Sequence, residues 1–402
     1  MDRAHPSDAL FVAYRACTRF MLIAPYFFHY ATSVRGLSPA AFGWITAVYY
    51  VTTVVLELPS GILADRFGRR RMLVAGAVAL GLGSLLLGNA HDLLTFVAAE
   101  MLFAIGTGMI SGADSALLYD RLADEGRPED YPRIEGAGTA AWLLSTALAM
   151  PLADLFLVRG GDPTATIWFT AGAQGLAVLL ALTLREPARR NRGFREITLG
   201  AMRNVVRVPG VARWIAISVG VFVLIRAAIV LVYNPVLTAA SIPVERWGTL
   251  LAGINLLGGL AAWQAHRVTY GRNAERLIFL LPVVLGAMYL GIAFLRTPAV
   301  ALLFGVQGIA LGLYPVAMRA VLNRRIPEAE HRATVLSIES LACRLGFAAT
   351  ALVVGSRLEA ESLGVAIAAV LAIGLAPIGL AGLLRRSAAM LSADERGARE
   401  RS

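Results

Sequence analysis

The sequence predicts an all-α membrane protein with twelve transmembrane helices in two related halves. Three observations predict this class: the composition, a series of apolar runs of membrane-spanning length, and an internal repeat. Hydrophobic residues make up 57% of the 402 residues and charged residues only 16%, and the mean hydropathy is +0.65. This balance is far from that of a soluble domain. The net charge of +10 therefore does not predict a nucleic-acid partner, because no soluble domain remains to carry a basic face.

Apolar runs divide the chain at regular intervals. A hydrocarbon core about 30 Å thick is crossed by about 20 apolar residues in a helix. Runs of this kind cover residues 9–32, 40–62, 72–89, 92–118, 136–158, 164–184, 211–233, 247–265, 277–295, 298–319, 334–355 and 362–384. No small-residue cleavage site follows the first run, so we expect it to be a span and not a signal peptide.

The arginines are distributed unevenly between the two sides of the predicted membrane. All 37 basic residues are arginine. With the N-terminus in the cytosol, the outer connections hold only Arg35, Arg159, Arg246, Arg296 and Arg357, and the spans hold Arg15, Arg19, Arg226 and Arg344 away from their cytosolic ends. Every other arginine falls on the cytosolic side, as the positive-inside rule requires. We expect a multi-pass protein of the bacterial inner membrane with both termini in the cytosol.

The two halves resemble each other at one fixed offset in sequence. The matching pairs are Trp44 and Trp247, Gly68 and Gly271, Arg69 and Arg272, Asp120 and Asn323, and Arg121 and Arg324. We expect an N-terminal bundle over 1–184, a cytoplasmic linker over 185–210, and a C-terminal bundle with a short tail over 211–402. The arginine-rich linker is predicted to be either a short amphipathic helix on the inner membrane surface or a solvated loop.

The connection after the second run carries the most specific motif of the chain. It reads Gly61-Ile62-Leu63-Ala64-Asp65-Arg66-Phe67-Gly68-Arg69-Arg70-Arg71. This pattern resembles the signature loop between helices two and three of the major facilitator superfamily. The resemblance spans essentially the whole chain. It implies two pseudo-symmetric six-helix bundles, alternating access to a central cavity, and a cavity lined by the first, fourth, seventh and tenth helices.

Charged residues at the predicted cytosolic helix ends form one candidate site. By the resemblance they belong to a cytoplasmic gate, whose ion pairs would form in one conformation and break in another. The members are Gly61, Asp65, Arg66, Gly68, Arg69, Asp120, Arg121, Glu135, Arg272, Arg324, Glu339 and Arg344. The alternative is that these charges only anchor the topology.

Polar residues inside the predicted spans form a second candidate site for substrate and protons. Charged side chains cannot face lipid cheaply, so they should point toward water or toward one another. The candidates are Arg15, Arg19, Tyr26, Glu57, Glu100, Asp114, Arg226, Tyr233, Asn234, Gln307 and Tyr314. Helical spacing places Arg15, Arg19, Leu22, Tyr26 and Tyr30 on one face of the first run. In the alternative interpretation Arg15, Arg19, Glu100 and Asp114 pair across helices and never contact substrate.

The predicted function is secondary active transport of a small organic solute. No phosphate-binding G-x-x-x-x-G-K-[ST] loop is present, so energy should come from an ion gradient, most simply protons exchanged at Glu57, Glu100 or Asp114. Export of an amphipathic compound by a proton antiporter is favoured, although the span 136–158 lacks the G-P-x-x-G-G pattern of many exporters.

Two other functions stay open: uptake of a small anion, and a membrane sensor or enzyme that does not transport. We expect a monomer in the lipid bilayer, with a small-molecule substrate, no cofactor, no metal and no enzymatic activity. Cys17 and Cys343 are expected to be buried, without a disulfide.

Overall fold

The structure is a computed structural model. It describes residues 6–111, 113–160, 163–186, 210–268, 273–295, 297–325, 329–360 and 362–399, and among these it does not describe the side chains of 58, 59, 61, 62, 65, 158–160, 329–334 and 383–399. Arg272 and nearly all of the linker expected over 185–210 therefore lie outside the described residues. Gly61 and Asp65 lie in a described helix, but their side chains do not belong to the described part.

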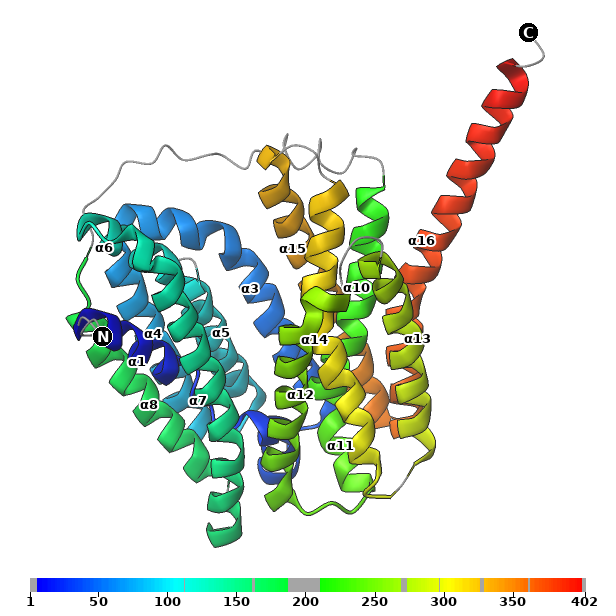
Figure 1. Cartoon of the computed structure of the whole chain (residues 1–402). Coiled ribbons are helices and arrows are strands. Elements are labelled where there is room, and N and C mark those ends of the chain that lie inside the picture. Colours follow the sequence, from blue (N-terminus) through cyan, green and yellow to red (C-terminus); the bar gives the residue numbers. More distant parts are fainter. Residues whose placement is uncertain are drawn as a thin grey trace. The chain divides into compact units, whose positions relative to one another are not determined.

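Every regular element in the described part of the chain is helical (Figure 1). The N-terminal elements are α1 (Pro6–Thr18), η1 (Ala24–Tyr26), α2 (Phe27–His29), η2 (Tyr30–Val34), α3 (Pro39–Phe67), α4 (Arg69–Gly88), α5 (Leu93–Ser111), α6 (Asp114–Asp124), η3 (Pro128–Asp130), α7 (Tyr131–Gly160) and α8 (Thr164–Thr183). The later elements are α10 (Val211–Ala227), η4 (Ala228–Val232), α11 (Tyr233–Ala239), η5 (Val244–Arg246), α12 (Trp247–Val268), α13 (Asn273–Phe294), α14 (Val300–Arg325), α15 (Ala329–Ala360) and α16 (Leu363–Arg399).

Ten helical segments among the described residues are long and apolar enough to cross a membrane. They correspond to ten of the twelve expected spans. The other two expected spans are 9–32 and 247–265. The second of these is the continuous helix α12, which carries the polar residues Asn255 and Gln264.

The first expected span is not one continuous helix. α1 ends at Thr18, and the chain resumes helical structure only at Ala24, in a short 3-10 turn followed by α2 and the π-helical η2. Pro25 lies in this turn, and a proline cannot donate the backbone hydrogen bond that a helix interior needs. The expected single face through Arg15, Arg19 and Tyr26 is therefore wrong, because helical spacing does not persist across the break.

The chain forms two compact units. The first comprises residues 1–195 together with 234–256, and the second comprises 196–233 together with 257–402. Part of the second sequence half, from Asn234 to Leu256, thus packs within the first unit. In that unit α4 packs on α5 and α8, α3 packs on α5, and α1 packs on α7 and α8. Gly76 and Gly106 let α4 and α5 approach closely, because a Cβ on Gly106 would lie 2.7 Å from the Gly76 carbonyl oxygen.

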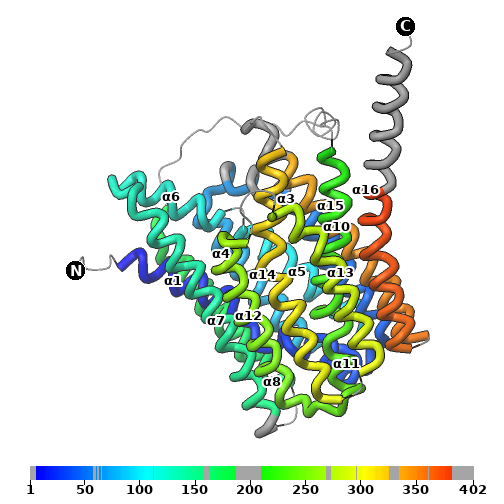
Figure 2. Tube along the Cα trace, turned by 45° about the vertical axis from the view of Figure 1, so that its right-hand side comes forward, coloured from blue at the N-terminus to red at the C-terminus, as the bar shows by residue number. Residues whose placement is uncertain are grey.

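In the second unit α10 packs against α15 and α16, and α13 packs against α14 (Figure 2). The core of this unit includes Trp214 and Tyr289, which are 1% and 0% exposed. The Tyr289 hydroxyl donates to the Leu224 carbonyl oxygen at 2.7 Å and so joins α13 to α10. A buried hydroxyl needs such a partner, because without one it would carry its full desolvation cost.

Candidate functional site

A buried ion-pair cluster joins α1, α6 and α7. Arg15 on α1 is 5% exposed. Its guanidinium lies 3.0 Å from an Asp114 carboxylate oxygen and 2.9 Å from Glu135 Oε1. Ser115 completes the cluster, because its hydroxyl accepts from Arg15 and donates to Glu135, each at 2.9 Å. A cation this deep in the helices must be paired, and two carboxylates from two other helices pair it.

The local sequence makes room for that arginine. A Cβ on Gly138 of α7 would lie 2.9 Å from Arg15 Cδ, so a larger residue would displace the side chain. The guanidinium carbon also stacks 4.8 Å from the centre of the Phe11 ring. Of the candidates expected in the spans, Arg15 and Asp114 thus contact each other, together with Glu135, which was expected in the gate.

A second cluster ties the start of α1 to the loop after α6. Arg121 is 1% exposed and pairs with Asp8. Arg127 also contacts Asp8, at 3.0 Å, and Asp130 at 2.7 Å. Hydrogen bonds to Asp8 and then to Asp130 raise the pKa of Arg127 above its ordinary value. Asp8 was not identified from the sequence, although it is the acidic residue in the first turn of a helix that also carries Arg15.

The signature loop is held by two carboxylates from elsewhere in the first unit. Arg69 pairs with Asp120 of α6, and its guanidinium also donates to the Ala116 carbonyl oxygen. Glu186, just beyond α8, accepts from the backbone amides of Arg69 at 2.8 Å and Arg70 at 2.9 Å. These amides belong to the unsatisfied first turn of α4, which has a partial positive charge.

Gly68 permits this arrangement. Its φ of +99° lies in a region that side chains rarely adopt, and a Cβ there would meet Glu186 Oε1 at 3.0 Å. Arg66, by contrast, is exposed, and its guanidinium carbon lies 5.7 Å from the centre of the Phe67 ring. Glu186 was not identified from the sequence. Its signal was an acidic residue directly after a span, in a segment otherwise rich in arginine.

Asp154 on α7 organises the opposite end of the first unit. It is 6% exposed. Its carboxylate accepts from the amides of Gly248 at 2.8 Å and Thr249 at 2.6 Å, at the start of α12, and from the Tyr26 hydroxyl. Nearby, Asn234 Oδ1 accepts from the His29 amide at 3.1 Å. These contacts fix Tyr26 and Asn234, both expected in the cavity, to a residue and a backbone that sequence reasoning did not single out.

Asp154 had a clear signal in the sequence. It is a carboxylate in the interior of an apolar run, and the same rule that selected Glu100 and Asp114 would have selected it.

The second unit holds a hydroxyl–carboxylate cluster around Glu339. Glu339 on α15 accepts from Ser218 of α10 and, at 3.1 Å, from Tyr314 of α14. The thiol of Cys343 lies 3.5 Å from the same carboxylate oxygen. Ser218 lies 203 residues after Arg15, and Glu339 lies 204 residues after Glu135. The two units therefore build equivalent contacts, an ion pair in the first and a hydrogen bond in the second.

The remaining second-unit candidates are placed as follows. Gln307 is 1% exposed and donates to the Ile225 carbonyl oxygen at 3.2 Å. Tyr233 is buried with its ring edge-on to Phe304. Arg324 is exposed at the end of α14, whereas Arg226 and Arg344 are half-buried on α10 and α15.

Three first-unit candidates remain separate from these clusters. Arg19 follows the end of α1 and stacks on Trp142 at 4.8 Å, within electrostatic range of Asp114 but without an ion pair in the described part of the chain. Glu100 is half-buried on α5, close enough to Tyr49 to interact with its hydroxyl. Glu57 is half-buried on α3. Arg19 and Glu100 form no ion pair with each other. Among the described residues no group of three His, Cys, Asp or Glu side chains could hold a metal ion.

Comparison with known proteins assigns the fold. The sequence model of the Major Facilitator Superfamily matches residues 10–304. An uncharacterized transporter of Buchnera aphidicola is 28% identical over 33% of this chain and 34% of its own length. Multidrug resistance protein 1 of Bacillus subtilis is 28% identical over 38% of each chain. These matches span about a third of the relatives' length.

A solved structure resembles nearly the whole chain. A mutant of the nucleoside transporter NupG superposes with a TM-score of 0.79, at 13% identity, over 94% of this chain and 99% of its own. At that identity the likeness concerns the fold alone, and it confirms the expected helical architecture. Because the family model also matches residues 10–304, the chain belongs to the Major Facilitator Superfamily.

Proposed function

We propose that this transporter exports an amphipathic organic compound in exchange for protons. Membership of the superfamily supports transport of a small molecule through a membrane, and the family and fold point to a transporter and not to an enzyme. The arginine distribution supports an orientation with both termini in the cytosol. Among the relatives, the Bacillus subtilis protein is named for multidrug resistance.

One observation carries the choice of mechanism: the environment of Glu100. Its carboxylate lies on the membrane-spanning helix α5, and within the described residues it takes part in no ion pair or hydrogen bond. A carboxylate in a span without a cationic partner is costly when charged, and binding a proton removes that cost. The deprotonated form would attract a cationic substrate, so the carboxylate can exchange a proton for an organic cation.

The test uses purified protein in proteoliposomes with a pH gradient and the lipophilic cation ethidium. We expect the Glu100→Gln variant to lose gradient-driven accumulation and to keep exchange of ethidium down its own gradient. The matched control is Glu129→Gln, which removes an exposed carboxylate in η3 and should transport as wild type does. Accumulation by Glu100→Gln with the pH dependence of the wild type would exclude Glu100 as the proton site.

Uptake of a small anion is the second candidate, and Arg19 favours it. Its guanidinium has no carboxylate within ion-pair distance among the described residues, in contrast to Arg15. In a low-dielectric site an unpaired guanidinium attracts an anion strongly. This function would be favoured if the wild type transports organic anions but not ethidium, and if Arg19→Gln loses transport of the anions.

A further inference from the structure

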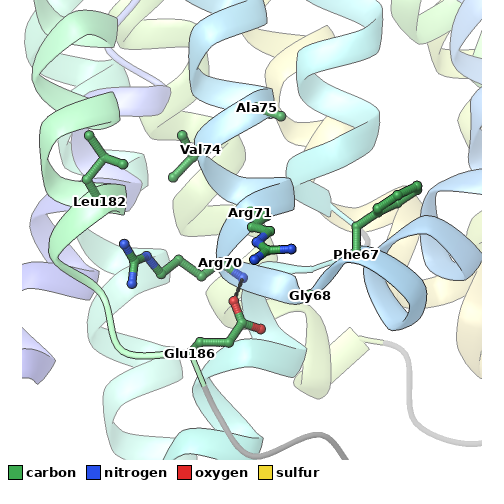
Figure 3. Close-up of a pocket in the computed structure, with 8 residues that line it drawn as sticks. All are labelled: Phe67, Gly68, Arg70, Arg71, Val74, Ala75, Leu182 and Glu186. Carbon is green, nitrogen blue, oxygen red and sulfur yellow. Dashed lines mark hydrogen bonds between the residues drawn. The ribbon is translucent and has the colours of Figure 1, made fainter.

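A pocket opens beside the signature loop, where α3 turns into α4 and α8 ends (Figure 3). Its volume is about 490 Å³. Arg70, Arg71 and Glu186 supply the polar part of its lining, and Phe67, Val74 and Leu182 supply apolar surface. The pocket lies wholly within the first unit, at the end of two membrane-spanning helices.

The charges that line this pocket are unbalanced. Glu186 is already engaged by the backbone amides at the start of α4, at 2.8 and 2.9 Å. Its carboxylate therefore compensates the helix terminus and not the arginine side chains. Neither guanidinium, of Arg70 or of Arg71, forms an ion pair or hydrogen bond with the described residues. Arg70 extends toward α8 and Arg71 emerges one residue later on α4 (Figure 3). The lining keeps a net positive charge.

Two apolar stripes lead from the membrane interior to these arginines. On α4, Val78, Leu82 and Leu85 follow Arg71 at helical spacing and are 39%, 50% and 45% exposed. On the neighbouring α8, Leu176, Leu179 and Leu182 are 49%, 61% and 47% exposed. α4 and α8 pack side by side, so the two stripes run along adjacent helices and end at the same pocket. The surface is therefore apolar along its length and cationic at its end.

We propose that this pocket binds the phosphate of an anionic phospholipid. The phosphodiester contacts Arg70 and Arg71, and the acyl chains lie along the exposed leucines and valines of α4 and α8. Arginine suits this role because its planar guanidinium donates two parallel hydrogen bonds to phosphate oxygens. Basic pockets between transmembrane helices bind anionic head groups in the same way. A soluble phosphate ester would use the arginines but leave the apolar stripes unused, so the occupant is a lipid.

The test measures lipid retention by the full-length protein with native mass spectrometry in mixed micelles of phosphatidylglycerol and phosphatidylcholine. Wild type should retain phosphatidylglycerol preferentially. The double variant Arg70→Gln/Arg71→Gln should lose that preference at least about tenfold, since it removes both cationic side chains of the lining. The matched control is Arg276→Gln/Arg319→Gln, which removes two exposed arginines of α13 and α14 and should leave retention unchanged.

A gain-of-binding variant guards against a misfolded double mutant. Glu186→Gln keeps one of the two oxygens that accept from the α4 amides. It removes a negative charge from the lining, so phosphatidylglycerol retention should rise. Unchanged retention in Arg70→Gln/Arg71→Gln would overturn the proposal, as would an equal loss in the control pair. If glycerol 3-phosphate competes with an affinity equal to that of the lipid, the occupant is a soluble phosphate ester, and the proposal of a lipid is overturned.

Discussion

At the scale of single residues, the buried arginines of the first unit each meet carboxylates from other helices. Arg15 contacts Asp114 and Glu135, and Arg121 contacts Asp8. Burial removes the water that would otherwise solvate these charges, so the carboxylates are needed for the arginines to stay in place. Arg325 forms a comparable pair with Glu275 at 2.8 Å but remains 46% exposed, and solvent screens it.

Breaking the buried pair should cost far more stability than breaking the exposed one. Arg121→Gln leaves Asp8 buried with only Arg127 near it, and we expect the free energy of unfolding to fall by about 3 kcal/mol. Arg325→Gln should lower it by no more than about 1 kcal/mol. Unfolding of the purified protein in detergent, titrated with denaturant, measures both. Equal losses would show that Asp8 does not depend on Arg121.

Variants of Arg69 and of the exposed Arg66 can test whether the signature loop acts through its ion pair or only anchors the topology. Arg69→Gln removes the partner of Asp120, whereas Arg66→Gln removes an exposed charge. If the signature loop gates transport, Arg69→Gln should lower the transport rate about tenfold or more at unchanged membrane insertion, because the buried carboxylate of Asp120 loses this guanidinium. Arg66→Gln should transport normally. The rate of ethidium counterflow, divided by the amount of protein in the membrane, is measured for both variants. Equal rates would show that the signature loop only anchors the topology.

At the scale of helices, two termini in the first unit are capped by carboxylates distant in sequence. Glu186 caps α4, and Asp154 caps α12. The first amides of a helix have no partner within that helix, and burying them without partners would be costly. Each cap also joins two helices, α8 to α4 and α7 to α12. The caps thus contribute to helix packing as well as to helix formation.

The α12 cap should be measurable in a short series of variants. Asp154→Ala removes the acceptor for Gly248 and Thr249, and loss of an N-terminal cap costs about 1–2 kcal/mol. Asp154→Asn keeps an oxygen that can accept, so it should retain most of the stability. Glu245→Ala is the control, because this exposed acid lies only a few residues before α12. If denaturant unfolding shows that Asp154→Asn loses as much stability as Asp154→Ala, capping of α12 is not the cause of the loss.

At the scale of the whole molecule, the repeat places equivalent contacts in both halves with different chemistry. Arg15 and Glu135 form an ion pair, whereas their counterparts Ser218 and Glu339 form a hydrogen bond. A hydroxyl satisfies one lone pair of the carboxylate but does not neutralise its charge. The duplicated architecture therefore keeps the position of the contact while its electrostatics differ.

The orientation of the whole chain can be tested with two introduced cysteines. In a background without Cys17 and Cys343, Asn89→Cys should react in intact cells with a membrane-impermeant maleimide, because the α4–α5 connection is expected outside. Gly126→Cys, in the arginine-rich connection after α6, should react only after the membrane is opened, as the positive-inside rule predicts. The reverse pattern would place the termini outside.

The helical class, the family and ten of the membrane spans could be predicted from the amino-acid sequence, because apolar length, arginine bias and the loop around Gly68 are local properties. Arg15 and Asp114 were selected because a charge in an apolar run is visible without a partner, and Glu135 was selected as an acid at a cytosolic helix end. Which of these side chains contact one another depends on how the helices pack. Asp8, Glu186 and Asp154 acquire their roles from helices distant in sequence. The spacing of residues in the sequence shows which side chains share a face of one helix, whereas an ion pair between helices depends on the positions of both helices.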